Sequence, residues 1–260
     1  MFDWTAYLVG FGVMFTACCG LWLVSLLKHD VSIVDSLWPM LFLLAAASYF
    51  AMLPEPGPRA MLVLAITAIW SIRLFVYITW RNWGEAEDRR YQQIRANNQP
   101  NFELKSFFIV FFFQGLIAWI VSLPLLLAIA APQALGWLDL IGVALWAIGM
   151  VFEAGGDYQL ARFKADPANK GAVMQYGLWR YTRHPNYFGN ACLWWGFGLL
   201  ALSSGSWWVL LSPLLMTFLL LKVSGVSLLE SDIGTRRPGY AEYIKNTSAF
   251  FPLPPRGRAG

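Results

Sequence analysis

The sequence has few charged residues for its length. Asp, Glu, Lys and Arg make up 13% of the 260 residues, whereas soluble domains carry about 25%. Hydrophobic residues make up 58%, and a surface that is so apolar has to face lipid rather than water. The shortage of charge therefore argues against a soluble domain and predicts an integral membrane protein whose first partner is the lipid bilayer.

Cysteine is also scarce. Cys18, Cys19 and Cys192 lie in apolar runs and lack metal-ligand spacing, which excludes a disulfide framework and a zinc site. We therefore expect no bound metal, and we expect no nucleic-acid partner, while the oligomeric state stays open. The N-terminal segment has no basic n-region and its first apolar run is too long for a signal peptide, so we expect that run to be retained.

Long apolar runs dominate what is present. A membrane-spanning helix needs roughly 20 mostly apolar residues, and the sixth run found here is short and glycine-rich, which indicates tight packing against a neighbouring helix. The predicted fold is an all-α, polytopic transmembrane helical bundle of about seven helices. The runs cover about residues 5–27, 33–54, 59–80, 106–132, 136–156, 186–203 and 206–229.

The basic residues are divided unevenly between the two ends of these runs. Most of the 19 Lys and Arg residues lie in the first, third and fifth connections and in the C-terminal tail, whereas Arg59 lies on the other side. The positive-inside rule places the basic side in the cytoplasm. We therefore expect a multi-pass protein of the inner (cytoplasmic) membrane, with its N-terminus outside and its C-terminus in the cytoplasm.

Residues 153–190, between the fifth and sixth runs, carry more hydrogen-bonding side chains than a connection needs. Arg180, Arg183 and His184 are cationic or can become so, and arginine binds phosphate with two parallel donors. The residue Pro185 favours the first turn of a helix, and a helix N-terminus also attracts phosphate. The segment therefore predicts a phosphate-binding site at the membrane surface.

Three further side chains of this segment suit the rest of a nucleotide. Asn186 and Tyr187 offer amide and phenol groups that match a carboxamide or a ribose, and Trp179 offers a face for ring stacking. The alternative is that the whole segment anchors the protein to anionic lipid. Composition by itself leaves the two interpretations open.

The segment also carries a family resemblance. The stretch GLWRYTRHPNYFGN resembles the C-terminal signature shared by membrane-embedded steroid 5α-reductases, sterol C14-reductases and isoprenylcysteine or phospholipid methyltransferases. Upstream, Asp157, Gln159, Phe163 and Lys164 resemble the D-x-Q-x-x-x-F-R run of the sterol reductases, with Lys164 in place of Arg. Downstream, LLESDIGTRRPGYAEYIKNTSAFFP resembles the ending of the group. More narrowly, the chain resembles the bacterial DUF1295 branch filed with the 5α-reductases.

The resemblance implies an NADPH pocket formed by the last helices and open to the cytoplasm. At the matching positions, Arg183 and His184 would lie at the phosphates, and the tail would close the site. Additional cations suit NADPH because its 2′-phosphate brings close to two more negative charges. The residues predicted to bind the cofactor are Asp157, Gln159, Arg162, Lys164, Trp179, Arg180, Arg183, His184, Asn186, Tyr187, Asn190, Glu230, Arg236, Tyr240 and Tyr243.

Ionisable residues within the predicted spans are a second set of candidates, because charge inside a membrane is costly. The segment RLFVY, which begins at Arg73, resembles R-T-F-V-Y of the steroid 5α-reductases. In those enzymes a Glu of helix two and a Tyr three residues before this Arg bind the substrate carbonyl. Here Trp70 stands in place of that Tyr, and Asp35 lies one residue from the register of the Glu. The predicted catalytic residues are Asp35, Trp70, Arg73 and Tyr77.

Asp35 has two possible roles. A carboxyl group that is desolvated inside a bundle holds its proton more tightly and can act as a general acid. Alternatively, Asp35 forms a structural ion pair with Arg73 that joins the second and third helices. The sequence does not decide between these roles.

The predicted function is NADPH-dependent hydride transfer to a C=C bond of a lipophilic substrate, either steroid-like or another enone or isoprenoid. Residues 1–132 would form the substrate half and residues 133–260 the cofactor half. The alternative enzyme is an S-adenosylmethionine-dependent methyltransferase acting on a lipid or a prenylated cysteine, since it shares the RHPxYxG core. A transporter or lipid-binding scaffold is the non-enzymatic alternative.

Overall fold

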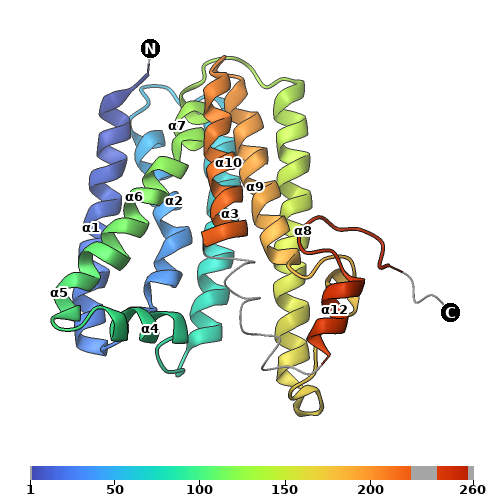
Figure 1. Ribbon diagram of the computed structural model, residues 1–260. Helices are drawn as coiled ribbons and strands as arrows, with labels where there is room; N and C mark the ends of the chain where they lie inside the picture. Colours follow the sequence, from blue (N-terminus) through green and yellow to red (C-terminus); the bar gives the residue numbers. More distant parts are fainter. Residues whose placement is uncertain (1, 224–238, 257–260) are drawn as a thin grey trace. The chain divides into compact units, whose positions relative to one another are not determined.

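The protein is helical throughout the part of the chain that its computed structural model describes, residues 2–223 and 239–256. Within these ranges there is no strand beyond an isolated bridge between Thr182 and Ser248. Figure 1 shows the order of the helices. They are α1 (Trp4–Lys28), α2 (Val34–Ala51), α3 (Pro58–Asn82), α4 (Arg89–Asn97), α5 (Phe102–Ser106), α6 (Phe113–Val121), α7 (Leu123–Ala130), α8 (Trp137–Ala165), α9 (Pro185–Leu202), α10 (Leu211–Phe218) and α12 (Tyr240–Asn246).

Within residues 2–223 and 239–256, five continuous helical stretches are long and apolar enough to cross a membrane. The sixth and seventh predicted runs coincide with α9 and with a shorter apolar stretch, Trp207–Val223, which contains α10 and a π-helical turn, η5 (Leu219–Val223). The all-α fold is therefore confirmed, whereas seven crossings and their orientation stay predictions. The five stretches are Trp4–Lys28, Val34–Ala51, Pro58–Asn82, Phe102–Ala130 and Trp137–Ala165.

The fifth helix is longer than the sequence suggested. Its apolar run was expected to end at residue 156, but α8 continues to Ala165 and is followed by the 3₁₀ turn η2 (Pro167–Asn169). The end of an apolar run shows where a helix leaves the lipid. The helix itself ends only where the backbone can no longer stay helical. Here the helix-forming residues persist until shortly before Pro167, which cannot occupy a helix interior.

The chain divides into two compact units. The first unit comprises Met1–Gly136 and Ala201–Val209, and the second comprises Trp137–Leu200 and Leu210–Gly260. In the first unit α2 packs against α1, α3, α6 and α7, and α4 lies across one end of these helices (Figure 1). Its interior contains fully buried Met14, Phe42 and Trp70. The boundary between the units at residue 136 falls close to the predicted division at 132, and the substrate and cofactor halves stay a prediction.

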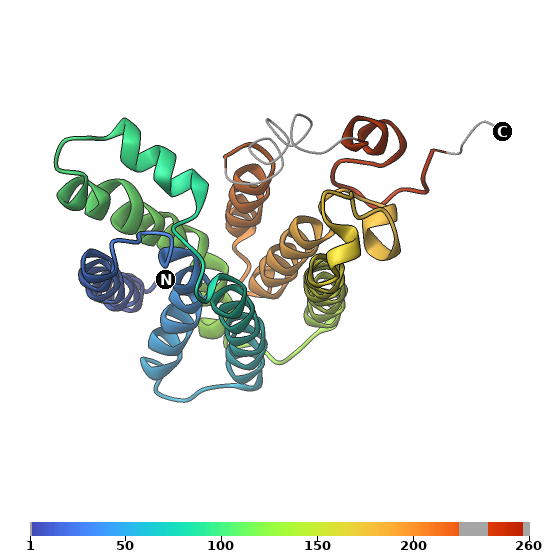
Figure 2. The same ribbon diagram turned by 90° about the horizontal axis from the view of Figure 1, so that it is seen from below.

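In the second unit, glycines bring α8 and α9 into backbone contact. Gly142 and Gly149 lie seven residues apart on one face of α8, opposite Gly196 and Gly189 of α9. A Cβ atom added to Gly142 would lie 2.9 Å from the Gly196 carbonyl oxygen, and one added to Gly149 would lie 2.6 Å from that of Gly189. Figure 2 shows the two helices side by side. The tight packing predicted for the glycine-rich run is thus confirmed, because only glycine leaves room for this approach.

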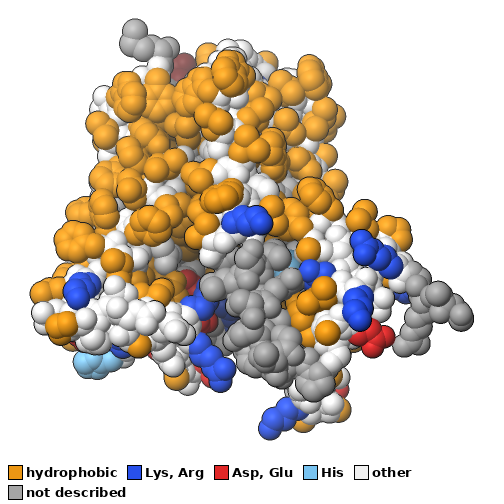
Figure 3. Space-filling view, in the orientation of Figure 1, with side chains coloured by type: hydrophobic (Ala, Val, Ile, Leu, Met, Phe, Trp, Pro, Cys, Tyr) orange, Lys and Arg blue, Asp and Glu red, His pale blue; other side chains and the backbone are white. Residues whose placement is uncertain are grey.

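Hydrophobic and charged side chains are separated along the helices of each unit. In Figure 3 hydrophobic side chains cover most of the upper part of each unit, and most of the visible charged side chains lie toward the end that carries α4 or α12. A surface that is apolar over the length of a helix suits lipid, whereas a charged end suits water and headgroups. This separation supports a multi-pass membrane protein.

Candidate functional site

Two acid–amide pairs extend the glycine contact between α8 and α9. Asn190 Nδ2 donates to Glu153 Oε2 at 3.1 Å, and Asn186 Nδ2 donates to Asp157 Oδ1 at 3.2 Å. Residues four apart share a helix face, so both carboxylates of α8 face both amides of α9. Both carboxylate residues are buried. The predicted residues Asp157, Asn186 and Asn190 therefore converge in one polar cluster, here called the acid–amide row.

The loop that leads into α9 is fixed to α8 by predicted site residues. Gln159 Oε1 accepts a hydrogen bond from Leu178 N at 2.9 Å. Gly177 has φ +62°, and a Cβ atom there would lie 2.5 Å from Gln159 Oε1, so this position requires glycine. Gln159 thus positions the turn η3 (Gly177–Arg180).

Trp179 lies inside the second unit rather than on its surface. Its indole Nε1 donates to the Gly156 carbonyl oxygen at 3.0 Å, and its ring packs in a small cluster with Phe163 and Met174. Only 9% of the residue is exposed. In this arrangement the indole joins η3 to α8, while ring stacking on a cofactor stays a prediction.

The C-terminal segment is bound to the same loop. Arg183 N donates to the Ser248 carbonyl oxygen at 2.9 Å, and Arg183 Nη1 donates to the Thr247 carbonyl oxygen at 2.6 Å. Tyr243 Oη donates to the Trp179 carbonyl oxygen. Tyr240 is also buried, with its ring 5.6 Å from that of Tyr243. The tail is therefore bound to the loop, while the cofactor-binding roles of Tyr240 and Tyr243 stay predictions.

A hollow of about 430 Å³ lies between this tail and the loop. Arg183, Asn246 and Arg256 contribute polar groups to its wall, and Ile244 and Leu253 contribute apolar ones. The volume lies within the range of small-molecule pockets, and the two guanidinium groups suit an anion.

The remaining predicted residues of this unit divide into two stacked rings and three exposed cations. His184 is buried, and its ring stacks on that of Tyr187 at 5.5 Å between centroids. Arg162, Lys164 and Arg180 are exposed, with Arg162 Nη1 donating to Tyr158 Oη at 3.3 Å. These three cations thus lie at the surface of the unit. Glu230 and Arg236 lie outside the described residues.

In the first unit, Asp35 is bound by α4. Arg90 Nη2 lies 2.7 Å from Asp35 Oδ2, and Tyr91 Oη donates to Asp35 Oδ1 at 2.6 Å. Arg90, rather than Arg73, forms the ion pair with Asp35, so the alternative of an Asp35–Arg73 pair was wrong. The sequence pointed to Arg73 because it lies within a span, whereas the polar segment with Arg90 folds back as a helix over the end of α2.

The other predicted catalytic residues lie along α3. Trp70 is fully buried, with its ring 5.7 Å from that of Phe42. The guanidinium carbon of Arg73 lies 5.5 Å from the centre of the Tyr77 ring, and that of Arg81 lies 5.7 Å from the same centre. Arg73 and Tyr77 therefore share a helix face, as their spacing predicted.

A second set of charge contacts holds α4 in place. Glu87 accepts from Val31 N at 2.9 Å and from Arg95 Nη2 at 2.8 Å. Burial by itself would raise the pKa of Glu87, but the hydrogen bonds from Arg95 and Val31 and the charge of Arg95 lower it below its ordinary value. The Arg95 guanidinium also lies 4.5 Å from the centre of the Phe102 ring.

Sequence reasoning did not identify Arg90, Tyr91 or Gln114 as site residues. Arg90 and Tyr91 belong to a polar connection that hydropathy treats as a loop. Gln114 stands as a lone polar side chain among aromatic residues, which was an available signal. Glu153 lies four residues before Asp157, and this spacing also placed it on the same face.

Comparison with known proteins gives a family but no solved relative. A curated protein of Schizosaccharomyces pombe, described as uncharacterized, is 27% identical over 277 residues, which cover 95% of this chain and 79% of that protein. No solved structure matches the chain. The family described as "Protein of unknown function (DUF1295)" matches residues 21–247. This match covers most of the chain. The chain therefore belongs to the DUF1295 family, the steroid 5α-reductase-like group.

Proposed function

We propose that the protein is a membrane-embedded, NADPH-dependent reductase that acts on a C=C bond of a lipophilic substrate. The observation that carries the proposal is the acid–amide row between α8 and α9, where Asp157 and Glu153 face Asn186 and Asn190. Buried carboxylates and amides inside a membrane protein are costly and mark functional sites. Membership in the DUF1295 family supports a membrane enzyme.

The donors and acceptors of the second unit fit a phosphorylated dinucleotide. Carboxylates and amide oxygens accept hydrogen bonds from ribose hydroxyl groups and from a carboxamide, while guanidinium groups bind phosphates. Asn186 and Asn190 would hold the nicotinamide end, and Arg183, beside the hollow that also contains Arg256, would hold phosphate. When bound, NADPH supplies a hydride.

The exposed cations favour NADPH over S-adenosylmethionine. Arg162, Lys164 and Arg180 lie at the surface of the same unit as the acid–amide row. S-adenosylmethionine has no phosphate, so a methyltransferase would give these cations no ligand. We place the reductase in the inner membrane with this unit's charged end in the cytoplasm, where NADPH is found.

Thermal unfolding of the detergent-purified protein tests the proposal. NADPH at 100 times its dissociation constant should stabilise the protein by about 2.7 kcal/mol, and NADH and S-adenosylmethionine should stabilise it less. Asn186→Ala should abolish the NADPH effect, whereas Asn97→Ala, on the exposed face of α4, should leave it unchanged. A protein that NADPH does not stabilise, or that S-adenosylmethionine stabilises more, would refute the reductase.

A further inference from the structure

The chain after α12 forms a closed loop in the second unit. Arg256 N donates to the Asn246 carbonyl oxygen at 3.0 Å, so residues 246–256 return to their own starting point. Leu253 N, within this loop, donates to the Tyr181 carbonyl oxygen at 3.0 Å, directly after η3. Residues 246–256, here called the tail loop, therefore have a shape that backbone hydrogen bonds hold in place.

The hollow of about 430 Å³ lies on this tail loop, and much of its wall is apolar. Ile244, Ala249, Leu253 and Pro254 contribute apolar groups to the wall. Ile244 is 40% exposed although it lies at the charged end of the unit. Apolar surface that stays in contact with water is unfavourable and often marks an interaction site. The hollow therefore suits a ligand with an apolar part.

The charge at the hollow is positive. The exposed side chain of Arg256 contributes to its wall. Arg183 also reaches the wall, and its Nη1 donates to the Ile244 and Thr247 carbonyl oxygens at 3.2 and 2.6 Å, so this nitrogen holds the tail loop. No described residue of the wall carries a carboxylate. The ligand should therefore be an anion, and guanidinium groups bind phosphate through two parallel donors.

Aromatic contacts place the tail loop beside the apolar part of α8. The Phe250 ring lies 5.9 Å from that of Phe188, in the first turn of α9, and the Phe188 ring lies 5.0 Å from that of Phe152. Phe152 is fifteen residues from the start of α8 at Trp137, about 22 Å along the helix. The hydrocarbon core of a bilayer is about 30 Å thick. A spanning α8 would therefore keep the tail loop close to the lipid.

The outer surface of the tail loop continues this apolar surface. Phe251 is 65% exposed, with its ring 6.2 Å from that of Phe188, and Leu253 is 54% exposed. The exposed cations Lys245 and Arg256 precede and follow them in the chain. Figure 3 shows hydrophobic and basic side chains next to one another at the end of the unit that carries α12. Apolar and aromatic side chains flanked by cations suit the surface of an anionic membrane.

We propose that the hollow and the exposed side of the tail loop form a binding site for an anionic phospholipid of the bilayer. Arg256 binds the phosphate group, and Phe251 and Leu253 contact an acyl chain. The ligand is a lipid because a soluble anion would leave these apolar side chains in water. The family match ends at residue 247, so the family resemblance does not supply this site, and the site does not depend on the proposed reductase.

Native mass spectrometry of the full-length protein in detergent tests the site without cofactor. The probes are phosphatidylglycerol, which is anionic, and phosphatidylcholine with the same acyl chains, which is zwitterionic. A cation near the membrane surface favours an anionic lipid by about fivefold, and Arg256 and Lys245 both contribute. The tightest site of the wild type should therefore bind phosphatidylglycerol more than about tenfold more tightly than phosphatidylcholine, and equal affinities would overturn the proposal.

The two parts of the site predict different changes. Arg256→Gln removes the charge and should raise the Kd for phosphatidylglycerol by about fivefold, with the Kd for phosphatidylcholine nearly unchanged. Arg256→Lys should restore most of the affinity. Leu253→Ser removes an apolar contact and should weaken the binding of both lipids alike, so that the ratio of their Kd values is kept.

Matched controls lie at the charged end of the first unit. Arg89→Gln makes the same change of charge at an exposed position of α4, and Leu104→Ser makes the same apolar-to-polar change at an exposed position of α5. Both should leave the tightest phosphatidylglycerol site unchanged. Losses equal to those of Arg256→Gln and Leu253→Ser would show a general attraction of lipid to the protein, and this would overturn the proposal.

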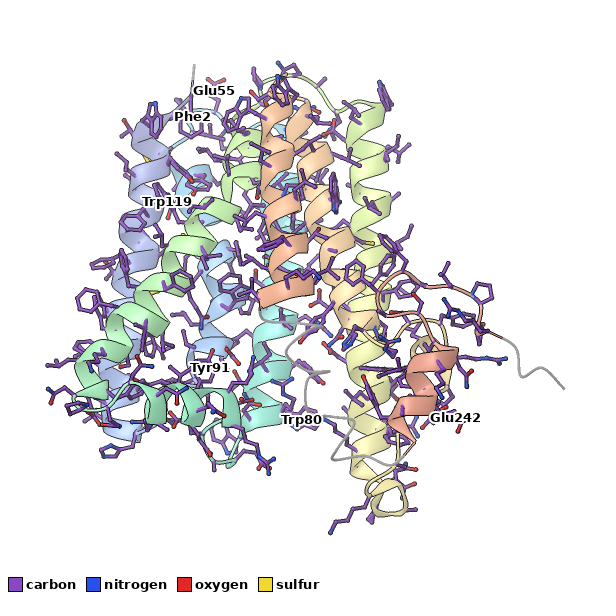
Figure 4. All side chains as sticks on the ribbon, in the orientation of Figure 1. Phe2, Glu55, Trp80, Tyr91, Trp119 and Glu242 are labelled. Atoms are coloured by element: carbon purple, nitrogen blue, oxygen red, sulfur yellow. The ribbon has the colours of Figure 1, made fainter. Side chains whose placement is uncertain are left out.

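Fluorescence in vesicles tests the lipid contact independently of these variants. Bimane is attached to Phe251→Cys in the full-length protein, in vesicles of phosphatidylglycerol with brominated acyl chains, and the wild type labelled in parallel gives the background. Bromine quenches the dye on contact, so the emission should fall strongly. The control is Glu242→Cys, because Figure 4 shows Glu242 on α12 toward the charged end of the unit, and its dye should keep its emission. Equal quenching at both positions, or none at residue 251, would overturn the lipid contact.

The outcomes separate this site from the cofactor site. If the hollow serves a soluble coenzyme instead, Arg256→Gln should weaken the stabilisation by NADPH and leave phosphatidylglycerol binding unchanged, which overturns the lipid site. A wild-type protein that NADPH does not stabilise refutes the reductase, while the lipid measurements, made without cofactor, still decide the lipid site.

Discussion

The close approach of α8 and α9 at Gly149 makes Gly149→Ala a demanding test of the packing in the second unit. The added methyl carbon would lie 2.6 Å from the Gly189 carbonyl oxygen and 2.7 Å from Leu193 N. Both are backbone atoms, so neither can rotate away as a side chain would. The two helices have to separate, and this separation would also lengthen the Glu153–Asn190 bond one turn further along α8.

The magnitude follows from two opposing terms. Forcing an extra methyl group into a packed interface costs about 1–3 kcal/mol, and contact with backbone on both sides places this site at the upper end. Alanine is a better helix former than glycine by about 1 kcal/mol. The net loss should be about 2 kcal/mol, which lowers the Tm of a chain of this size by about 4–8 °C.

The assay is thermal unfolding in detergent, with Gly20→Ala as the matched control. Gly20 lies within α1 and has no atom within 4 Å of an added Cβ, so its replacement should raise the Tm slightly. Gly149→Ala should also weaken the NADPH-dependent stabilisation. A Gly149→Ala protein that is as stable as the wild type would refute the packing argument for the α8–α9 contact.

Three further predictions concern stability. Gly177→Ala should lower the Tm more than Gly171→Ala does, because both have positive φ but only Gly177 would press a Cβ atom against a side chain; equal losses would contradict this. Arg59→Met should lower the free energy of unfolding by about 2–3 kcal/mol, because buried Arg59 donates to three carbonyl groups just after α7. An unchanged free energy of unfolding would contradict this prediction. The pKa of Glu87 is lowered in the folded protein. Ionised Glu87 therefore stabilises the fold above about pH 4.3, the pKa of a Glu in the unfolded chain, and this stabilisation is lost as the pH falls through the pKa in the folded protein. The Tm should therefore drop less on acidification in Glu87→Gln than in the wild type or in the exposed Glu85→Gln control, and parallel curves for all three would exclude the effect.

The sequence predicted the helices well because they depend on local composition. The apolar runs at 5–27, 59–80 and 186–203 correspond to α1, α3 and α9 within a few residues. The glycine-rich run predicted close packing because glycine has no side chain to hold helices apart. The end of α8 was missed because hydropathy does not report where a polar helix stops.

The candidate site was predicted best where its residues are close in sequence. Asp157, Asn186 and Asn190 lie on the flanks of one loop, and the fold brings them together as expected. The partners of Asp35 were missed because Arg90 and Tyr91 approach it only after the polar connection folds back as α4. Arg90 and Asp35 are 55 residues apart in the sequence, so no local sequence pattern predicts their pairing.

The sequence by itself determined that this protein is helical and apolar enough for a membrane. These properties follow from composition and short-range spacing, which the chain carries whether or not it is folded. Tertiary structure alone decided that Arg90 neutralises Asp35 and that Gln114 donates a hydrogen bond to Tyr91. The physical reason is that an ion pair or a hydrogen bond depends on distances of about 3 Å, and only packing brings distant residues that close.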